Sequence, residues 1–200
     1  MSLDSALNVL RTTPRQRGSL AGLLVLAACG GGGDTSNAAT PAVSAASSPS
    51  GAAASTCGLT NFQATVLART NQFRAAGATC GSRGAFAPAT ALTWNNPLTQ
   101  AAEGHSQDMK TNNFFAHDSF DGRTFDQRIT AAGYVFSRAA ENIAAGQTSI
   151  DQVMTGWMGS EGHCANIMNP NLTEIGVVCV SGSANNGFST YWTMDLGTPR

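Results

Sequence analysis

The sequence is poor in charged residues and has no cluster of basic ones. Charged side chains make up 12% of its 200 residues, and 11 Lys and Arg stand against 12 Asp and Glu. Proteins that bind nucleic acid or anionic lipid headgroups carry a basic patch or stripe. The composition therefore argues against nucleic acid as a partner.

Several motifs of metal and nucleophile chemistry are missing as well. The sequence contains no Cys-x-x-Cys pair, which argues against a zinc ribbon or a thioredoxin-like redox site. It has no His-x-x-x-His pair and no Gly-x-Ser-x-Gly elbow. The usual short signatures of a zinc enzyme or a serine hydrolase therefore do not assign a reaction.

A long apolar run is also lacking, and this decides how the N-terminus is interpreted. Arg11, Arg15 and Arg17 precede an apolar stretch over residues 20–28. That stretch is too short to cross a bilayer as a permanent helix, but it has the length of the apolar part of an export signal. We predict that residues 1–28 are a signal peptide.

The apolar stretch ends in Leu26-Ala27-Ala28-Cys29, which resembles the lipobox of bacterial lipoproteins. The alternative is ordinary signal cleavage that leaves Cys29 as a free thiol. Lipidation is favoured because five Cys are present and an exported protein tends to pair its thiols. We therefore predict a lipidated Cys29 that attaches the protein to the bacterial cell envelope. Because Gly30 rather than Asp follows the Cys, the membrane would be the outer one in a Gram-negative organism.

Residues 30–56 lack the large apolar residues that a core requires. They are almost entirely Gly, Ala, Ser, Thr and Pro, and Val43 is the only larger aliphatic residue. Burial there cannot offset the entropy of ordering the chain. We expect residues 29–56 to form a lipidated, disordered tether with an average span of about 30 Å, and residues 57–200 to form one compact domain.

Helix start signals occur four times in this domain. Thr60 and Thr124 each open a capping box, Asn96-Pro97 supplies an N-cap with a first-turn proline, and Ser149 precedes an apolar helical face. Glycines close three of the four segments. The predicted helices run over residues 60–77, 96–109, 124–133 and 149–159.

The pattern changes after residue 170. β-branched and aromatic residues dominate residues 175–180 and 189–196, and turn-prone residues separate the two runs. They predict an antiparallel hairpin. Helices that come first and strands that come last, without β-α-β alternation, favour an α+β fold with a small antiparallel sheet.

Two of the histidines differ clearly in their surroundings. His105 falls on the apolar face of the second predicted helix, level with Met109, so we expect a buried imidazole that is hydrogen-bonded within the structure. His117 follows Phe114-Phe115 and precedes a turn-rich stretch. Because loop residues held by a rigid scaffold usually form sites, His117 is the better functional candidate.

Glu141 and His163 are the other candidates. Glu141 is a lone carboxylate among small and apolar neighbours, so it needs a hydrogen-bond or cation partner; binding loop amides is the alternative to a role in a site. His163 precedes Cys164, whose disulfide would fix its position. Two His and one carboxylate suit zinc or another transition metal. Ser160 lacks the surroundings of a nucleophile and is interpreted as a cap.

Ten short segments, in this order and spacing, resemble the CAP superfamily and most closely its bacterial secreted branch. The superfamily includes the cysteine-rich secretory proteins, insect antigen five allergens and plant pathogenesis-related proteins. The segments are NQFR (71–74), LTWN (92–95), AAEGHSQDM (101–109), FFAH (114–117), DGR (121–123), AGY (132–134), ENIAAG (141–146), WMGSEGH (157–163), NIMNP (166–170) and YWT (191–193).

The resemblance implies a three-layer α-β-α sandwich with a cleft of two His and two Glu. The His positions correspond to His117 and His163, and the first Glu corresponds to Glu141. The second Glu of animal and plant members falls at Ser160, so one carboxylate is missing. Glu161 is adjacent, but one step along a helix turns it roughly 100° away. A divalent metal such as zinc, where one is bound, would be held by the two His with Glu141.

The resemblance also bears on the disulfides. Four Cys allow three pairings, and spacing alone does not choose among them. Bacterial members similar to this chain keep the Cys-Gly and Gly-His-Cys positions, which implies pairs of Cys80 with Cys164 and of Cys57 with Cys179. Local pairing, of Cys57 with Cys80 and of Cys164 with Cys179, is the alternative.

Activities in this family are varied, so the fold does not deliver the function. The first hypothesis is a non-enzymatic, membrane-tethered binding module that presents its cleft to a lipid, a peptide or a cell-wall component. The second is a metal-dependent hydrolase that uses His117, Glu141 and His163. A third is a structural surface lipoprotein. The missing second carboxylate favours binding over catalysis.

Overall fold

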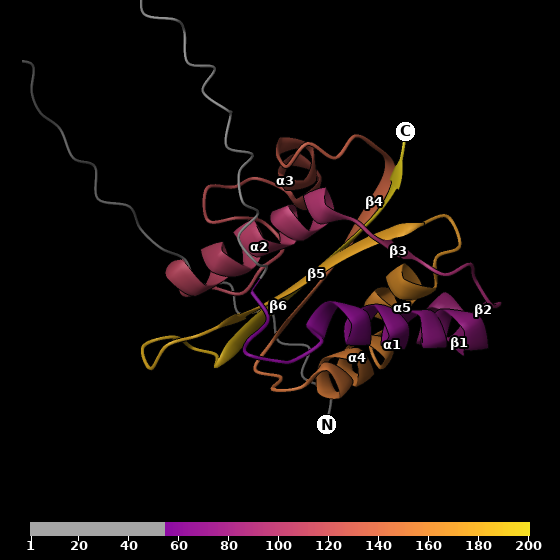
Figure 1. Ribbon diagram of the computed structural model, residues 1–200, viewed down its shortest axis with the longest axis horizontal. Coiled ribbons are helices and arrows are strands. Elements are labelled where there is room, and N and C mark those ends of the chain that lie inside the picture. The colour runs from indigo at the N-terminus through magenta and orange to yellow at the C-terminus, as the bar shows by residue number, and fades with distance from the viewer. Residues whose placement is uncertain (1–54) are drawn as a thin grey trace, which may run out of the picture. The chain divides into compact units, whose positions relative to one another are not determined.

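The computed structural model describes residues 55–200. The predicted signal peptide, Cys29 and the predicted tether up to residue 54 lie outside the described residues. The described chain forms a three-layer α-β-α sandwich, in which α2 and α3 cover one face of a four-stranded sheet and α1, α4 and α5 cover the other (Figure 1). This is the α+β class and the layer order that the sequence led us to expect.

The central sheet has the strand order β3-β5-β6-β4. β5 (Glu174–Ser181) and β6 (Thr190–Pro199) form the predicted antiparallel hairpin. β4 (Phe136–Ala145) pairs antiparallel with β6 at one edge, and β3 (Thr93–Trp94) pairs parallel with β5 at the other. The long edge strand β4 was not predicted, because its small and polar residues hide the alternation that identifies a strand.

The helices begin at sites that local capping chemistry largely explains. The capping box of Thr124 and Gln127 and the N-cap of Ser149 form as predicted. The N-cap of α2 is Asn95, one residue earlier than predicted, and its side chain accepts a hydrogen bond from the Leu98 amide. The helices are α1 (Phe62–Ala76), α2 (Asn96–Thr111), α3 (Phe125–Ala131), α4 (Ile150–Met158) and α5 (Glu161–Met168).

Two features of the helices differ from the prediction. The capping box expected at Thr60 does not form: the N-cap of α1 is Asn61, which has a left-handed backbone with φ of 50° and no side-chain cap. α5 was not predicted, because a serine and two glycines before residue 163 indicate a turn. Tertiary contacts override that local signal, since Cys164 and Ile167 of α5 are fully buried.

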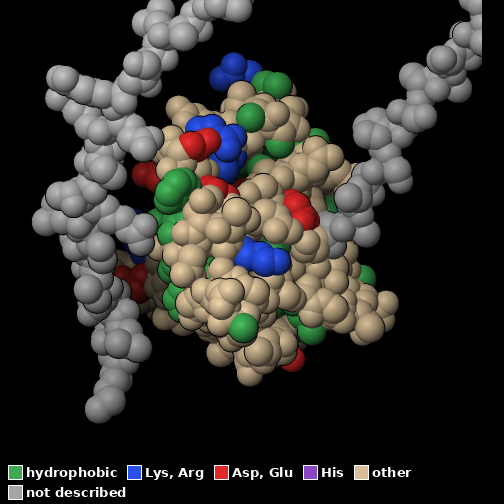
Figure 2. Space-filling view, turned by 90° about the vertical axis from the view of Figure 1, so that its left-hand side faces the viewer, with side chains coloured by type: hydrophobic (Ala, Val, Ile, Leu, Met, Phe, Trp, Pro, Cys, Tyr) green, Lys and Arg blue, Asp and Glu red, His purple; other side chains and the backbone are tan. Residues whose placement is uncertain are grey.

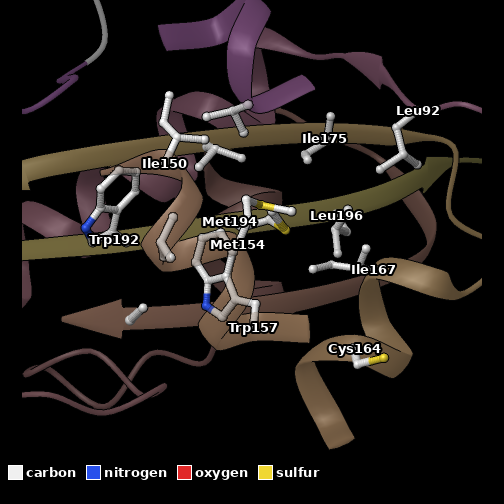
Figure 3. Packing of buried hydrophobic residues seen from close by; sticks show 14 of the residues in the cluster. Leu92, Ile150, Met154, Trp157, Cys164, Ile167, Ile175, Trp192, Met194 and Leu196 are labelled. Atoms are coloured by element: carbon white, nitrogen blue, oxygen red, sulfur yellow. The ribbon is translucent and has the colours of Figure 1, made fainter. Parts of the chain in front are cut away.

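The main apolar core lies between the sheet and the α1, α4 and α5 layer (Figure 3). Trp157 of α4 points toward Met194 of β6, and both side chains are buried. Trp192 and Leu196 of β6 belong to the same cluster. Because strand side chains alternate between faces, Asp195 must face the α2 and α3 layer. The site is built on that second face.

Two disulfides attach peripheral segments to this framework. Cys57 is bonded to Cys179 of β5, and Cys80 is bonded to Cys164 of α5, which are the pairs that the family resemblance implied. Cys80 lies beside a second, two-stranded sheet. This small sheet consists of β1 (Ala78–Thr79) and β2 (Ala85–Phe86), which flank a short 3-10 helix, η1 (Gly81–Arg83).

The described residues show neither a membrane-spanning helix nor, on the face shown in Figure 2, a basic patch. No helix within residues 55–200 is long and apolar enough to span a membrane. On the face that Figure 2 shows, Lys and Arg side chains are scattered among neutral atoms and do not gather in one patch.

Candidate functional site

A groove lies beside the edge strand β4, between the two helical layers. Its volume is about 480 Å³, and its walls come from the loop after α2, from α3, from β4 and from α5. His117 and Glu141 therefore share one groove. The lining residues are His117, Asp118, Thr124, Phe125, Asp126, Ala139, Ala140, Glu141 and Asn166.

His117 and Glu141 are directly hydrogen-bonded. Nδ1 of His117 lies 2.9 Å from Oε1 of Glu141. The His117 side chain is 52% exposed, whereas that of Glu141 is 1% exposed. A ring nitrogen that faces a carboxylate carries the proton, which assigns the tautomer of the neutral ring. The second ring nitrogen of His117 thus remains for a ligand.

The other oxygen of Glu141 is bound by Arg128 of α3. The guanidinium lies 2.5 Å from Oε2, and it also donates to Ser119 Oγ and to the backbone oxygen of Arg123. Burial raises the pKa of Glu141, but the hydrogen bond from His117 and the positive charges of His105 and Arg128 outweigh it and lower the pKa overall. Glu141 is therefore ionised and fixed at both oxygens.

A second acid, Asp195, lies behind this pair. It is the β6 partner of Glu141 across the β4–β6 ladder and is fully buried. Neither of its carboxylate oxygens has a hydrogen-bond partner among the described residues. Burial raises the pKa of Asp195 well above its usual range, and the negative charge of Glu141 raises it further. Burial beside the negative charge of Glu141 therefore favours the protonated form of Asp195.

His105 supports the loop that carries His117. Its side chain is fully buried on α2, and Nε2 lies 2.9 Å from the backbone oxygen of Ala116. Its ring meets the edge of Phe114, and burial lowers the pKa of the imidazole. His105 does not line the groove, so it has the structural position that its helical spacing predicts.

His163 and Ser160 do not line the groove. His163 is half-buried on α5, where burial lowers its pKa and the charge of His117 lowers it further. Ser160 is the N-cap residue of α5, but its side chain makes no capping hydrogen bond. Glu161 turns away from the groove and accepts a hydrogen bond from Ser82, beside the Cys80–Cys164 disulfide.

Asparagine side chains dock α5 against β4. Asn166 Nδ2 donates to the backbone oxygen of Glu141 at 3.3 Å and to Asn142 Oδ1 at 2.9 Å. Asn142 Nδ2 in turn donates to the backbone oxygen of His163 at 3.1 Å. The helix that carries His163 is thereby fixed against the strand that carries Glu141.

Sequence reasoning missed two charged residues of this site. Arg128 was included in a predicted helix, but nothing in the sequence indicated that its partner would be Glu141. Asp195 did leave a signal, because it is the lone acid in the predicted strand over residues 189–196. A carboxylate in a buried strand requires a partner or a proton.

The arrangement does not fit the predicted three-ligand metal site. Within residues 55–200, no group of three His, Cys, Asp or Glu side chains is placed to hold a metal ion. Both oxygens of Glu141 are already hydrogen-bonded, and the Arg128 guanidinium brings positive charge to the place where a divalent cation needs negative charge. Ser160 supplies no replacement carboxylate.

Sequence comparison relates this chain to a known family. A family profile described as CAP, the cysteine-rich secretory protein family, matches residues 67–196. The uncharacterized protein YkwD of Bacillus subtilis is 46% identical over 94 residues, which cover 46% of this chain and 36% of that protein. The uncharacterized membrane protein YlbC of the same organism is 37% identical over 86 residues, which cover 43% of this chain and 25% of that protein. The match thus spans well under half the length of each relative.

Solved structures agree with this relationship. An extracellular protein containing an SCP domain from Bacillus anthracis superposes with a TM-score of 0.55 at 30% identity, over 68% of this chain and 39% of that one. An outer surface protein from Borrelia burgdorferi superposes with a TM-score of 0.51 at 21% identity, over 56% of this chain and 80% of that one, and is similar in fold alone. Because the family profile covers more than half of its residues, the chain belongs to the CAP, or cysteine-rich secretory protein, family.

Proposed function

We propose that this protein is an exported, membrane-tethered lipoprotein whose CAP domain is a non-enzymatic binding module, with the groove beside β4 as its ligand site. The half-exposed His117, hydrogen-bonded to the buried Glu141–Arg128 pair, carries this proposal. Because both oxygens of Glu141 are engaged, the carboxylate is not free to act as a general base. The half-exposed imidazole of His117 is a polar group held in place for a ligand.

Export and anchoring have separate support. The two disulfides suit an oxidising compartment outside the cytoplasm. The Bacillus anthracis relative is described as extracellular and the Borrelia protein as an outer surface protein. Anchoring depends on the sequence that ends in Cys29. Mass spectrometry of the mature N-terminus should find a lipidated Cys29, and an unmodified Cys29 or a different start would contradict the anchor.

Binding is tested with the full chain purified from membranes in detergent. Calorimetric titration should detect binding of at least one probe among phospholipid vesicles, soluble cell-wall fragments and synthetic peptides. His117→Ala should weaken that binding about tenfold or more, because it removes the imidazole that Glu141 holds in place for a ligand. Asp151→Asn, an exposed change on α4, is the matched control and should leave binding unchanged. Binding that His117→Ala leaves intact would place the ligand elsewhere.

The metal-dependent hydrolase alternative lacks its metal site among residues 55–200, and His117, oriented by Glu141, is the group that would act as base in a metal-free reaction. The same samples, assayed with ester and peptide substrates with and without added zinc, should show no turnover that depends on His117. Turnover lost in His117→Ala would replace the binding proposal with a catalytic one.

A further inference from the structure

The outer side of β4 follows a regular hydrogen-bonding pattern. The Gly146 amide donates to the Thr190 oxygen at the end of the β4–β6 ladder, and the register continues residue by residue from there. Pairs that exchange hydrogen bonds alternate with pairs that do not in an antiparallel ladder. Even-numbered residues of β4 thus bond to β6. Ala139, Glu141 and Ile143 direct their backbone groups away from the sheet.

Side chains from α4 and α5 cover only part of this edge. Trp157 Nε1 donates to the Ile143 oxygen at 3.1 Å, and Asn166 Nδ2 donates to the Glu141 oxygen at 3.3 Å. Within residues 55–200, no hydrogen-bond partner is found for the Ala139 amide, the Ala139 oxygen or the Glu141 amide. These three groups lie where Ala139 and Glu141 line the groove. At the same point β4 changes from partly exposed to buried residues.

An uncovered strand edge of this kind is a template for another strand. Neighbouring strands lie about 4.8 Å apart, so the edge must be free of bulky side chains. Ala139 and Ala140 provide that access, because each carries only a methyl group.

The charges of the groove indicate what kind of side chain an added strand would carry at this point. Asp118 and Asp126 line the groove, are exposed, and form no salt bridge with another described residue. The charge of Glu141, in contrast, is balanced by Arg128. The remaining charge of the groove is negative, which complements an ammonium or guanidinium group.

We propose that the groove binds an extended peptide, which adds to the edge of β4 at Ala139 and Glu141 and places a basic side chain near Asp118 and Asp126. This names a ligand class for the site and rests on the proposed binding function. The exposed ring nitrogen of His117 lies beside the same edge and contacts the peptide, while Asn166 marks the point at which pairing ends.

The test uses the full chain in detergent and a blocked eight-residue peptide rich in Thr and Val with one central Lys. Calorimetry measures the dissociation constant, and amide exchange followed by NMR reads Ala139 and Glu141. Binding should slow exchange at both amides by about tenfold or more. Methylating alternate backbone nitrogens of the peptide should weaken binding by about tenfold or more, because two backbone hydrogen bonds are lost.

Charge recognition is tested on the same peptide. Replacing its Lys by norleucine should weaken binding by up to about fivefold, as expected for an exposed ion pair. A chain with Asp118→Asn and Asp126→Asn should no longer distinguish the two peptides. The control Asp151→Asn should still distinguish them.

Three results with the peptide would overturn strand addition. They are equal binding of the methylated peptide, unchanged exchange at Ala139 and Glu141, and no peptide binding at all. Slow exchange at Ala139 before peptide is added would also overturn it, because another segment would then occupy the edge. If a lipid or wall fragment still binds in a His117-dependent way, the proposed function stands and only the peptide is wrong. If no probe of the panel binds, both proposals fail.

Discussion

The two faces of the central sheet are made from alternate residues of the same strands, but their chemistry is opposite. Toward α1, α4 and α5, β6 presents Trp192, Met194 and Leu196 to one large apolar cluster. Toward α2 and α3, it presents Thr193 and Asp195, and β4 adds Glu141. The buried polar side chains on the first face, such as Arg74 of α1 and Asn142 of β4, donate hydrogen bonds to backbone oxygens, and neither is a carboxyl group. The second encloses carboxyl groups whose charge and protons must be balanced.

The first face therefore determines most of the stability of the domain, whereas the second face determines the geometry of the site. Apolar burial and close packing supply most of the stability of a domain. A buried ion pair adds little net stability, because desolvation offsets the Coulomb attraction, but removing one partner is strongly destabilising. We therefore expect substitutions on the first face to change stability equally at all pH values. Substitutions on the second face should change how stability depends on pH.

Trp157→Ala should have the largest effect. It leaves a cavity in the apolar face and removes the hydrogen bond to the Ile143 oxygen, so the free energy of unfolding should fall by about 4–5 kcal/mol. Urea unfolding at several pH values measures it. The loss should be independent of pH, and a loss that varies between pH 5 and 8 would weaken the contrast between the faces.

Arg128→Met should be nearly as destabilising at neutral pH, by about 3–4 kcal/mol, because it leaves Glu141 buried without its cation. The pKa of Glu141 is lowered in the folded protein, so its ionised form stabilises above the usual carboxyl pKa and that stability is lost as pH falls. The cost of Arg128→Met should therefore shrink in acid. A cost that stays constant in acid would contradict this account.

Asp195→Asn should have a smaller effect of the opposite sign. Because the folded pKa of Asp195 is raised, the acid stabilises fully only below its unfolded pKa, and stability falls as pH rises through the folded value. Asn cannot ionise and keeps an N–H that can donate to Glu141. At pH 8 the variant should be about 1 kcal/mol more stable than the wild type. Thermal unfolding across pH 4–8 measures the difference, and a variant that is less stable at every pH would show that Asp195 is ionised.

His117→Ala should have the smallest effect on stability, below about 1 kcal/mol, because the side chain is 52% exposed. Its effect on ligand binding should be much larger. Comparison of thermal unfolding with binding of the same ligand separates the two, and a stability loss as large as that of Arg128→Met would assign His117 to the scaffold.

Local chemistry predicted most of the helices and the terminal hairpin. Thr124 and Ser149 cap helices through atoms three residues away, so their sequence contains the whole signal. β4 was missed because Ala139 and Ala140 are small and Glu141 occupies an inward position, which removes the apolar alternation of a strand. α5 was missed because Gly162 follows its start.

The site was only partly predictable, because it depends on contacts between residues that are distant in sequence. The family resemblance pointed to His117, Glu141 and His163; the first two line one groove, and His163 lies on α5, close enough for the charge of His117 to lower its pKa. The balance of charge depends on Arg128 from α3 and Asp195 from β6. These partners are distant in sequence from Glu141, and no local pattern connects them.

The central claim is that Glu141 is held by Arg128 and His117 and does not serve a metal. Calorimetric titration of the full chain with zinc at pH 7.5, for the wild type and for Glu141→Gln, tests it most directly. The account predicts no zinc uptake that depends on Glu141, so the two titrations should agree. One zinc ion bound per wild-type chain, and lost in Glu141→Gln while the variant remains folded, would contradict it.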